Sequence, residues 1–328
     1  MKTAFITGIT GQDGSWLAEF LLEKGYKVVG LVSQKHDIGS QNIDHFKHKL
    51  ILETGDLLDK NSLKKIIKRY LPQEIYNLAG ITFVPISWEA SELTFNVDAL
   101  GPVRLLELIR SCSPKSKFYQ ATSAKIFGNP KTGPQNEKTV LNPDSPYAVS
   151  KAAAHFLIQN FRTHFGLFCC SGILYNHESE RRGPEFVTRK ITLTAAKIKL
   201  GKAKKLILGN INAQQDWGYA PDYVEAMWLM LQQKKADDYI IATGKVHSVK
   251  DICKLAFNYL DLDWQKYVQC GKTLIRKEEA QNFFGDFSKA KKELGWQPKV
   301  NFQKMIEKMV ESDLELIKKG EKCPQKRL

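Results

Sequence analysis

The chain has 328 residues, a length that suggests about two domains. Hydrophobic residues make up 43% and charged residues 26%, which is typical of globular proteins and excludes fibrous and disordered classes. No stretch approaches the ~18 consecutive apolar residues of a membrane-spanning helix. No Cys-x-x-Cys pair, and hence no zinc motif or disulfide framework, occurs among the six cysteines, which are Cys112, Cys169, Cys170, Cys253, Cys270 and Cys323. We therefore expect a reduced, cytoplasmic protein without a metal site.

The formal net charge of +14 has two interpretations. One is nucleic-acid binding, and the other is a lysine-rich surface together with a basic pocket for an anionic small molecule. The lysines are spread along predicted helix faces, such as Lys64, Lys65 and Lys68, without a zinc-finger or RNA-binding signature. This pattern favours a solvated surface, so we expect neither a nucleic-acid nor a membrane partner.

The first half of the chain alternates predicted strands and helices. Thr3–Thr7 is a short apolar run before the glycine-rich turn Gly8–Gly14, which indicates a strand rather than a signal peptide. A helix is predicted over Ser15–Lys24, with Gly25 suited to the position after its last turn. Further strands are predicted over Tyr26–Val32, Lys49–Thr54, Glu74–Leu78 and Lys117–Ala121, with helices near Asn61–Tyr70 and Asp98–Ser111. Repeated β-α-β units with continuous apolar strands predict an α/β fold with a doubly wound, Rossmann-type parallel sheet.

The second half is less regular. After residue 176 comes an arginine-rich stretch, then a predicted helix over Thr188–Leu200, short elements, and an amphipathic helix after Val300. We expect a Rossmann domain over residues 1–175, with part of 212–245. A smaller domain, packed over the strand ends, would comprise residues 176–211 and 246–328.

The glycine-rich turn predicts a dinucleotide site. Gly8, Gly11 and Gly14 follow a strand and open a helix, where glycine permits a sharp reversal and a close approach to a pyrophosphate. The helix N-terminus would offer N–H groups and a positive dipole end to the phosphates. Asp56, after the third strand, suits the adenine amine, and its alternative role is a loop residue that caps the next helix.

The end of the second strand distinguishes NADP from NAD. NAD binding usually uses an acidic residue there to hold the ribose hydroxyls, but the first acid in this stretch is Asp37. Ser33, Gln34 or Lys35 could bind the 2′-phosphate of NADP. The sequence therefore favours NADP, and NAD stays the alternative.

A Tyr-x-x-x-Lys pair is the second strong signal. Ser145 suits a helix N-cap and Pro146 the first helical position, so Tyr147 and Lys151 would lie one turn apart on one face. A phenol with a pKa near 10 is a poor base at neutral pH, but a neighbouring ammonium and a positive nicotinamide ring stabilise its phenolate. Tyr147 could then take a hydroxyl proton as hydride leaves the same carbon. Ser123, at a strand end, supports this interpretation.

These residues resemble an extended short-chain dehydrogenase/reductase, and more narrowly the GDP-mannose 4,6-dehydratase family. Asn-His-Glu-Ser followed by Arg-Arg-Gly is distinctive of that family. The matching stretches run over nearly the whole chain and are Thr-Gly-Ile-Thr-Gly-Gln-Asp-Gly-Ser (7–15), Ala-Glu-Phe-Leu-Leu-Glu-Lys-Gly-Tyr (18–26), Ser-Pro-Tyr-Ala-Val-Ser-Lys (145–151), Gly-Ile-Leu-Tyr-Asn-His-Glu-Ser (172–179), Phe-Val-Thr-Arg-Lys-Ile (186–191), Asp-Trp-Gly (216–218) and Ile-Ala-Thr-Gly (241–244).

The resemblance implies a GDP-sugar substrate, bound NADP, a smaller substrate domain and a homo-oligomer, a dimer or tetramer. It implies a catalytic set of Ser123, Lys125, Tyr147 and Lys151. The implied cofactor-binding residues are Gly8, Thr10, Gly11, Gln12, Asp13, Gly14, Asp56, Leu57, Leu78, Ala79, Tyr147, Lys151, His177 and Arg182. The implied substrate-binding residues are Ser87, Asn176, Val187, Lys190, Arg276 and Glu279.

Two alternatives apply to these residues. Arg181, Arg182, Arg189 and Lys190 could form a surface basic cluster, and His177 could be a structural histidine.

The resemblance also implies a reaction, and the sequence departs from the family pattern at more than one site. A 4,6-dehydratase moves hydride from C4 of the sugar to the cofactor, eliminates water across C5 and C6, and returns hydride to C6. The elimination needs a second acid–base group, a glutamate in the family, and Lys125 stands in its place, after Ala124. Gln214 and Gln215 also stand where the family tends to carry an arginine. We expect dehydration of a GDP-hexose, with a GDP-sugar 4-reductase, oxidase or epimerase as the alternative.

Overall fold

A seven-stranded parallel sheet forms the centre of the molecule. The computed structural model describes residues 1–33, 40–271 and 283–320. Within them the strand order is β10-β6-β5-β4-β1-β2-β3, and every pairing is parallel. The strands are β1 Thr3–Thr7, β2 Lys27–Val32, β3 Ile51–Thr54, β4 Glu74–Asn77, β5 Lys117–Ser123, β6 Cys169–Leu174 and β10 Tyr239–Ile241. The expected doubly wound sheet is confirmed.

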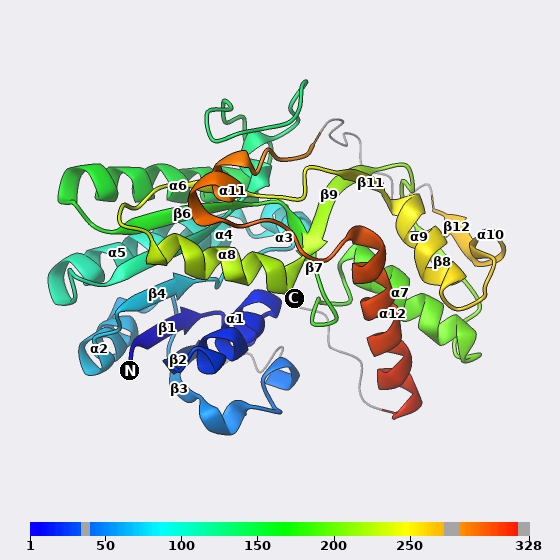
Figure 1. Ribbon diagram of the computed structural model, residues 1–328, viewed down its shortest axis with the longest axis horizontal. Helices are drawn as coiled ribbons and strands as arrows, with labels where there is room; N and C mark the ends of the chain where they lie inside the picture. The colour runs from blue at the N-terminus through cyan, green and yellow to red at the C-terminus, as the bar shows by residue number, and fades with distance from the viewer. Residues whose placement is uncertain (34–39, 272–282, 321–328) are drawn as a thin grey trace.

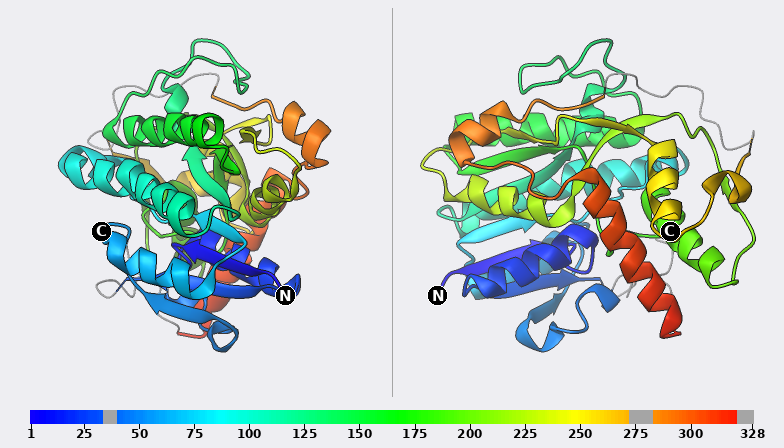
Figure 2. Two further views of the ribbon diagram at one scale, coloured as in Figure 1. Left: turned by 90° about the vertical axis from the view of Figure 1, so that its left-hand side faces the viewer. Right: turned by 45° about the vertical axis from the view of Figure 1, so that its right-hand side comes forward.

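Helices cover both faces of this sheet (Figures 1 and 2). Successive strand residues point to opposite faces, so Ile6 and Tyr76 pack under one helical layer, and Phe5 and Ile75 under the other. The first layer contains α1 Gln12–Glu23, α8 Ala220–Gln232 and α11 Ser288–Leu294. The second contains α2 Lys60–Tyr70, α5 Gly101–Cys112 and α6 Pro146–Phe165. Two apolar cores, one on each face, therefore fix the sheet.

A smaller, mixed part lies beyond the strand ends, at the right of Figure 1. Its strands are β7 Asn176–Glu178, β9 Gln214–Tyr219 and β11 Val246–Ser248 in one sheet, and β8 Leu206–Leu208 with β12 Val268–Cys270 in another. Its helices are α7 Val187–Lys199, α9 Val249–Asn258, α10 Trp264–Tyr267 and α12 Phe302–Lys318. Arg189 on α7 is only 1% exposed and donates to Asp313 on α12 at 2.7 Å. Arg189 is therefore a buried structural residue and not part of a surface basic cluster.

Two helix starts differ from the sequence prediction. Helix α1 begins at Gln12 rather than Ser15, because Gly11 is the N-cap in an extended conformation. The helix expected from Asp98 instead starts as a π-helical turn over Asn96–Leu100, η3, which follows the short helices α3 Val84–Glu89 and α4 Ser91–Phe95. Within the described ranges, 3₁₀ turns cover Ser40–Asn42, Lys47–Lys49 and Ala124–Phe127. None of the helices in the described ranges has the length and apolar character required to cross a bilayer.

Candidate active site

The glycine-rich turn is packed too closely for side chains. Gly8 has a φ of 71°, and a Cβ there would lie 2.8 Å from the backbone nitrogen of Ala79. A Cβ on Gly14 would lie 2.1 Å from the carbonyl oxygen of Gly8. The Thr7 hydroxyl accepts hydrogen bonds from the amides of Leu78 and Ala79, each at 3.2 Å. The ends of β1 and β4 are thus joined beneath the turn.

The start of α1 suits a pyrophosphate. Its N-cap, Gly11, supplies no side-chain oxygen, so the N–H groups of the first turn are not capped from within the helix. The helix dipole places partial positive charge at the same point. With the missing Cβ atoms at Gly8 and Gly14, this leaves a backbone cradle that fits a dinucleotide.

Asp13, in the first turn of α1, pairs with His177 of β7. His177 Nε2 lies 2.8 Å from Asp13 Oδ2, and His177 Nδ1 lies 2.7 Å from the carbonyl oxygen of Tyr175. Both ring nitrogens face acceptors, so the imidazole carries both protons. Burial alone would lower the pKa of His177, but the charge and hydrogen bond of Asp13 outweigh it and the pKa is raised. Burial favours the neutral carboxyl of Asp13, yet His177 holds its pKa at about 2.

The rest of the Asn-His-Glu-Ser stretch also binds the turn. The Ser179 hydroxyl donates to Gln12 Oε1 at 2.9 Å and accepts from the indole of Trp16 at 3.1 Å. Gln12 Nε2 donates to the His177 carbonyl at 3.1 Å. Arg182 lies with its Nε 3.1 Å from Glu178 and its guanidinium over the ring of Phe186. The motif therefore ties the smaller part of the molecule to the start of α1.

Tyr147 lies in the first turn of α6, near the end of β5. The Ser145 side chain accepts from the amide of Ala148 at 3.3 Å, and Pro146 occupies the first helical position. Ser123, the last residue of β5, lies close enough to the Tyr147 phenol for its side chain to influence the pKa of the phenol. Burial raises the pKa of Tyr147, while the Lys151 ammonium and the Ser123 hydroxyl act to lower it.

Lys151 is held by a buried carboxylate that the sequence analysis missed. Its ammonium donates to the carbonyl of Ala121 at 3.2 Å and lies 3.8 Å from Asp98 Oδ1. Asp98 Oδ1 also accepts from the amide of Ile81 at 3.1 Å, whereas Oδ2 has no hydrogen-bond partner among the described residues. Burial raises the pKa of Asp98 to about 6, against the opposing charge of Lys151.

The sequence carried only a weak signal for Asp98. It is an acidic residue between Val97 and Ala99, at an otherwise apolar helix start. A Cβ on Gly80 would lie 2.4 Å from Asp98 Oδ1 and 3.3 Å from Lys151 Nζ, so the glycine makes room for the pair. Asp98 reaches Lys151 from the π-helical turn η3, a kind of irregularity that is frequent at functional sites.

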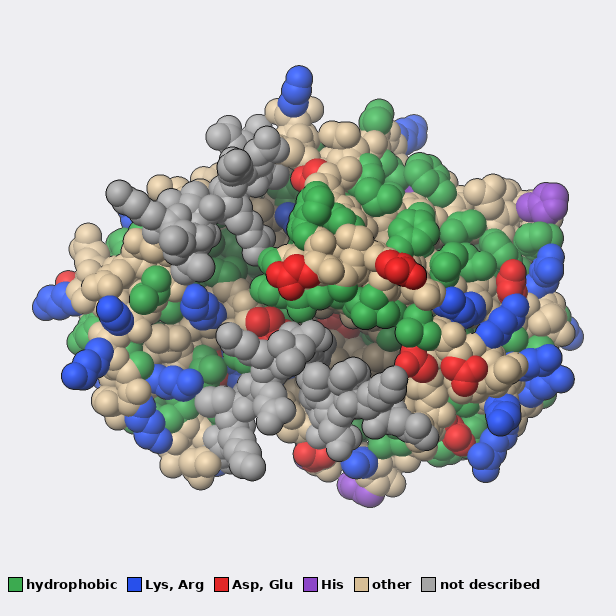
Figure 3. All heavy atoms as spheres, turned by 180° about the vertical axis from the view of Figure 1, so that it is seen from behind, with side chains coloured by type: hydrophobic (Ala, Val, Ile, Leu, Met, Phe, Trp, Pro, Cys, Tyr) green, Lys and Arg blue, Asp and Glu red, His purple; other side chains and the backbone are tan. Residues whose placement is uncertain are grey.

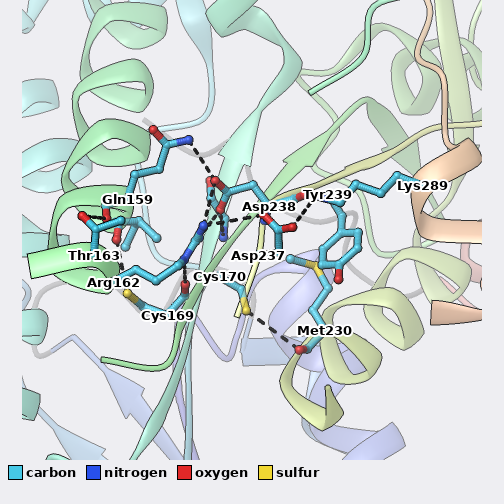
Figure 4. A network of polar contacts seen from close by, with 12 residues as sticks. Gln159, Arg162, Thr163, Cys169, Cys170, Met230, Asp237, Asp238, Tyr239 and Lys289 are labelled. Carbon is cyan, nitrogen blue, oxygen red and sulfur yellow. Dashed lines mark hydrogen bonds and ion pairs between the residues drawn. The ribbon is translucent and has the colours of Figure 1, made fainter. Parts of the chain in front are cut away.

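A polar network fixes the far end of α6, the helix that carries Tyr147 (Figure 4). The Arg162 guanidinium pairs with Asp238, and its Nε donates to the carbonyl of Cys169 at 2.8 Å. Asp238 also accepts from the amide of Ser171 at 2.9 Å and from Gln159 at 3.0 Å. Because β6 and the residue before β10 both take part, α6 cannot slide along the sheet without breaking several charged hydrogen bonds.

Lys125 lies in the 3₁₀ turn that follows Ser123. Its backbone amide donates to the Ser123 hydroxyl at 3.2 Å. Its ammonium donates to Gln215 Oε1 at 3.5 Å and lies 4.3 Å from the ring centre of Phe283. Asn176 Nδ2 donates to the same Gln215 oxygen at 3.3 Å. The structure thus brings Lys125 and Asn176 together through Gln215, whose role the sequence analysis did not predict.

The other predicted residues occupy varied positions. Asp56 is exposed and accepts from the amide of Leu58 at 2.9 Å, while Asp59 caps α2. Asp56 is therefore not the helix cap of the alternative interpretation. Ser87 is fully buried, and its hydroxyl donates to the carbonyl of Val84 at 2.7 Å. Lys190 donates to the carbonyl of Ile207 at 2.7 Å.

The structure also describes Leu57, Thr10 and Val187 of the predicted set. Leu57 is buried and packs beside Gly101, Thr10 accepts from Asn42 through its carbonyl, and Val187 begins α7. Four of the predicted positions lie outside the described residues, namely Gln34, Lys35, Arg276 and Glu279.

One cavity lies away from these side chains. It has a volume of about 600 Å³ and lies between β11, α9 and the start of α12. His247 and Phe302 form part of its wall, and their stacked rings have centroids 3.8 Å apart. None of the predicted catalytic residues lines it. The predicted catalytic residues Ser123, Tyr147 and Lys151 instead lie together near the end of β5, which makes that region the candidate active site.

Comparisons with known proteins identify the family. A family model described as GDP-mannose 4,6 dehydratase matches residues 5–309. GDP-mannose 4,6 dehydratase 1 of Arabidopsis thaliana is 48% identical over 330 residues, covering 97% of this chain and 91% of that protein. The dTDP-glucose 4,6-dehydratase of Bacillus anthracis str. Ames, solved with NAD, has a TM-score of 0.84 at 22% identity, over 95% and 96% of the two chains. RMD from Pseudomonas aeruginosa, complexed with NADPH, has a TM-score of 0.82 at 21% identity, over 96% and 99%. The chain belongs to the GDP-mannose 4,6-dehydratase family.

Proposed function

We propose that this protein converts GDP-mannose, or a close GDP-hexose, to its 4-keto-6-deoxy form. The observation that carries the proposal is the convergence of Ser123, Tyr147 and Lys151 at the strand ends, beside the cradle at Gly8. Relatives that match 97–98% of the chain are GDP-mannose 4,6-dehydratases.

The chain's own residues supply proton transfer and orientation. Ser123 holds the C4 hydroxyl of the sugar, and Tyr147 takes its proton as the C4 hydrogen leaves. Lys151, kept in place by Asp98, stabilises the Tyr147 phenolate. The cradle at Gly8, Gly11 and Gly14 would hold a nicotinamide dinucleotide, which would supply the hydride exchange at C4 and C6 of the sugar.

Lys125 is proposed as the acid–base group of the elimination. The C4 ketone acidifies the C5 hydrogen, which the neutral amine of Lys125 removes as a proton. The resulting Lys125 ammonium then gives that proton to the C6 hydroxyl, which leaves as water and returns Lys125 to the neutral amine. An amine serves as a base only when its pKa falls from about 10.4 toward neutrality.

We propose NADP as the cofactor, through Ser33, Gln34 or Lys35 at the end of the second strand. Related folds have been solved with NAD and with NADPH, so a nicotinamide dinucleotide is supported and its type needs a measurement. The mass of the dinucleotide that co-purifies with the protein distinguishes the two, because NADP carries one more phosphate.

A GDP-sugar 4-reductase, oxidase or epimerase is the second candidate. It is favoured by Lys125, which stands where the family resemblance places a glutamate. Such an enzyme would use Ser123, Tyr147 and Lys151 without eliminating water. It would consume added NADPH as it reduces a keto-sugar, whereas a dehydratase would leave the amount of added NADPH unchanged.

The test of the proposal is incubation with GDP-mannose. A 4-keto-6-deoxy product should appear without net consumption of added nicotinamide, and Tyr147→Phe should remove it. Product formation by that variant at the wild-type rate would overturn the assignment of Tyr147. Consumption of NADPH with a keto-sugar would favour the second candidate.

We also propose a homo-oligomer that forms through one face. Large apolar side chains are exposed on α3, α4, η3 and α6, which contact one another, and we call this the α3–α6 face. Its residues are Trp88, Leu93, Phe95, Leu100, Val149 and Phe156. Figure 3 shows apolar side chains gathered on the back of the molecule, the side covered by α5 and α6. A second copy presenting the same face would cover it.

Two further expectations stay proposals. The Rossmann domain would comprise residues 1–175 with part of 212–245, and the nucleotide-sugar domain residues 176–211 and 246–328. In the described residues α8 and β10 join the central layers, while β9 joins the smaller sheet. A cytoplasmic location stays a prediction from the cysteine pattern.

A further inference from the structure

The Lys125 side chain is held by residues from two distant segments. Its ammonium lies 3.5 Å from Gln215 Oε1 on β9 and 4.3 Å from the ring centre of Phe283. Phe283 is 1% exposed, so its ring is a fixed surface beneath the charge. A lysine has four rotatable bonds, and such contacts select one of its many conformations.

The orientation of the Gln215 amide follows from its neighbours. Gln215 Oε1 accepts from both Lys125 Nζ and Asn176 Nδ2, the latter at 3.3 Å. Both partners are donors, so a flipped amide would place its NH₂ group against two other donors. The oxygen is therefore the atom that faces Lys125.

An amide oxygen is suited to a residue that changes its protonation. It accepts a hydrogen bond from an ammonium and from a neutral amine alike, so the contact persists before and after Lys125 takes up a proton. A carboxylate at the same place would instead favour the ammonium and oppose its action as a base.

We propose that Gln215 is a positioning residue for the acid–base chemistry of Lys125, which it joins to the substrate-binding candidate Asn176. The inference rests on the proposed function, since it assigns Lys125 a proton-transfer step. It adds that this step depends on a side chain of the smaller sheet, contributed from outside the Rossmann strands.

The chain provides a matched control in the preceding residue. Gln214 lies on the same strand but is exposed and points to the opposite face. Gln215→Glu adds a negative charge beside Lys125, whereas Gln214→Glu adds the same charge without that contact. Competitive acetylation with acetic anhydride, carried out over a range of pH and measured at Lys125 by mass spectrometry, reports the protonation of the Lys125 amine. It needs no sugar substrate.

The two variants should differ in the pH at which Lys125 is labelled. Gln215→Glu should move the pH of half-maximal labelling of Lys125 upward by about one pH unit or more, and Gln214→Glu should leave it near the wild-type value. Equal shifts in both variants, or none in either, would refute the positioning contact. Because labelling needs no turnover, this result is independent of whether the protein dehydrates GDP-mannose.

Kinetics with GDP-mannose then test the chemical consequence. Gln215→Ala should lower kcat for the 4-keto-6-deoxy product about tenfold or more and change KM less than threefold. Gln215→Asn, which keeps a shorter amide, should recover part of the loss. A raised KM at unchanged kcat would make Gln215 a substrate-binding residue and overturn the proposal. A wild-type protein without dehydratase activity would refute the proposed function, while the labelling result would still decide the contact.

Discussion

His177 Nε2 lies 2.8 Å from the carboxylate of Asp13, a residue 164 positions earlier in the chain. The pair joins β7 to the first turn of α1, so a motif in the middle of the sequence braces the glycine-rich turn. Both side chains are largely buried and carry opposite charges. The ion pair therefore holds β7 against the start of the glycine-rich cradle.

Asp13→Asn should destabilise the protein at pH 6. The substitution keeps the shape of the side chain but removes the charge that His177 faces, at a cost of about 1.5–3 kcal/mol for a charged hydrogen bond. The free energy of unfolding from urea titration measures this. An equal stability of both proteins at pH 6 would show that the ion pair contributes nothing.

The pH dependence of this difference gives a second check. The pKa of Asp13 is lowered to about 2, so its contribution is present above 3.8 and lost as pH falls through 2. The pKa of His177 is raised from 6.5, so its contribution is complete below 6.5 and lost as pH rises through the raised value. The difference between wild type and Asp13→Asn should be largest between about pH 4 and 6.5.

Asp98→Asn should move the acidic limb of the activity profile to lower pH. Asp98 is one of the charges that raise the pKa of Tyr147, so its removal lets the phenol ionise more readily. The measurement is the pH dependence of kcat/KM for GDP-mannose. A limb that stays in place would mean that Asp98 acts only on the position of Lys151.

The same variant changes how stability depends on pH. The pKa of Asp98 is raised from 3.8 to about 6, so the folded protein holds its proton longer and stability falls as pH rises from about 4 to 6. In Asp98→Asn this loss, on the order of 3 kcal/mol, should disappear. Unfolding free energies at pH 4 and pH 7 measure it.

Lys125→Ala should separate the two candidate functions. A dehydratase would lose the elimination step by about 10²–10⁴-fold, because its acid–base group is gone. It should still oxidise C4, which is visible as absorbance of reduced nicotinamide. A reductase or epimerase should be little affected, and unchanged 4-keto-6-deoxy formation would exclude Lys125 from the elimination.

Phe156→Glu should disrupt the proposed oligomer. Phe156 is 51% exposed on the α3–α6 face, and a charge buried between two copies would be costly. Val140→Glu is the matched control, because Val140 is 82% exposed on a loop outside that face. Sedimentation velocity should show dissociation for Phe156→Glu alone. Identical behaviour of both variants would exclude this face as the interface.

Local patterns determined much of this protein. The strand–turn–helix at Gly8 and the one-turn spacing of Tyr147 and Lys151 follow from neighbouring residues, because backbone geometry repeats over a few positions. The order of the strands in the central sheet needed the tertiary structure, although the alternation of elements indicated the fold class.

Only the tertiary structure decided the contacts of Asp98 and Gln215. Asp98 reaches Lys151 because a π-helical turn and a glycine bring it under the strand ends, and no spacing in the sequence encodes that. Gln215 meets Lys125 across 90 residues, through the register of a second sheet. Sequence spacing is informative where the chain is locally regular. Where distant segments meet, the packing of layers determines which side chains touch.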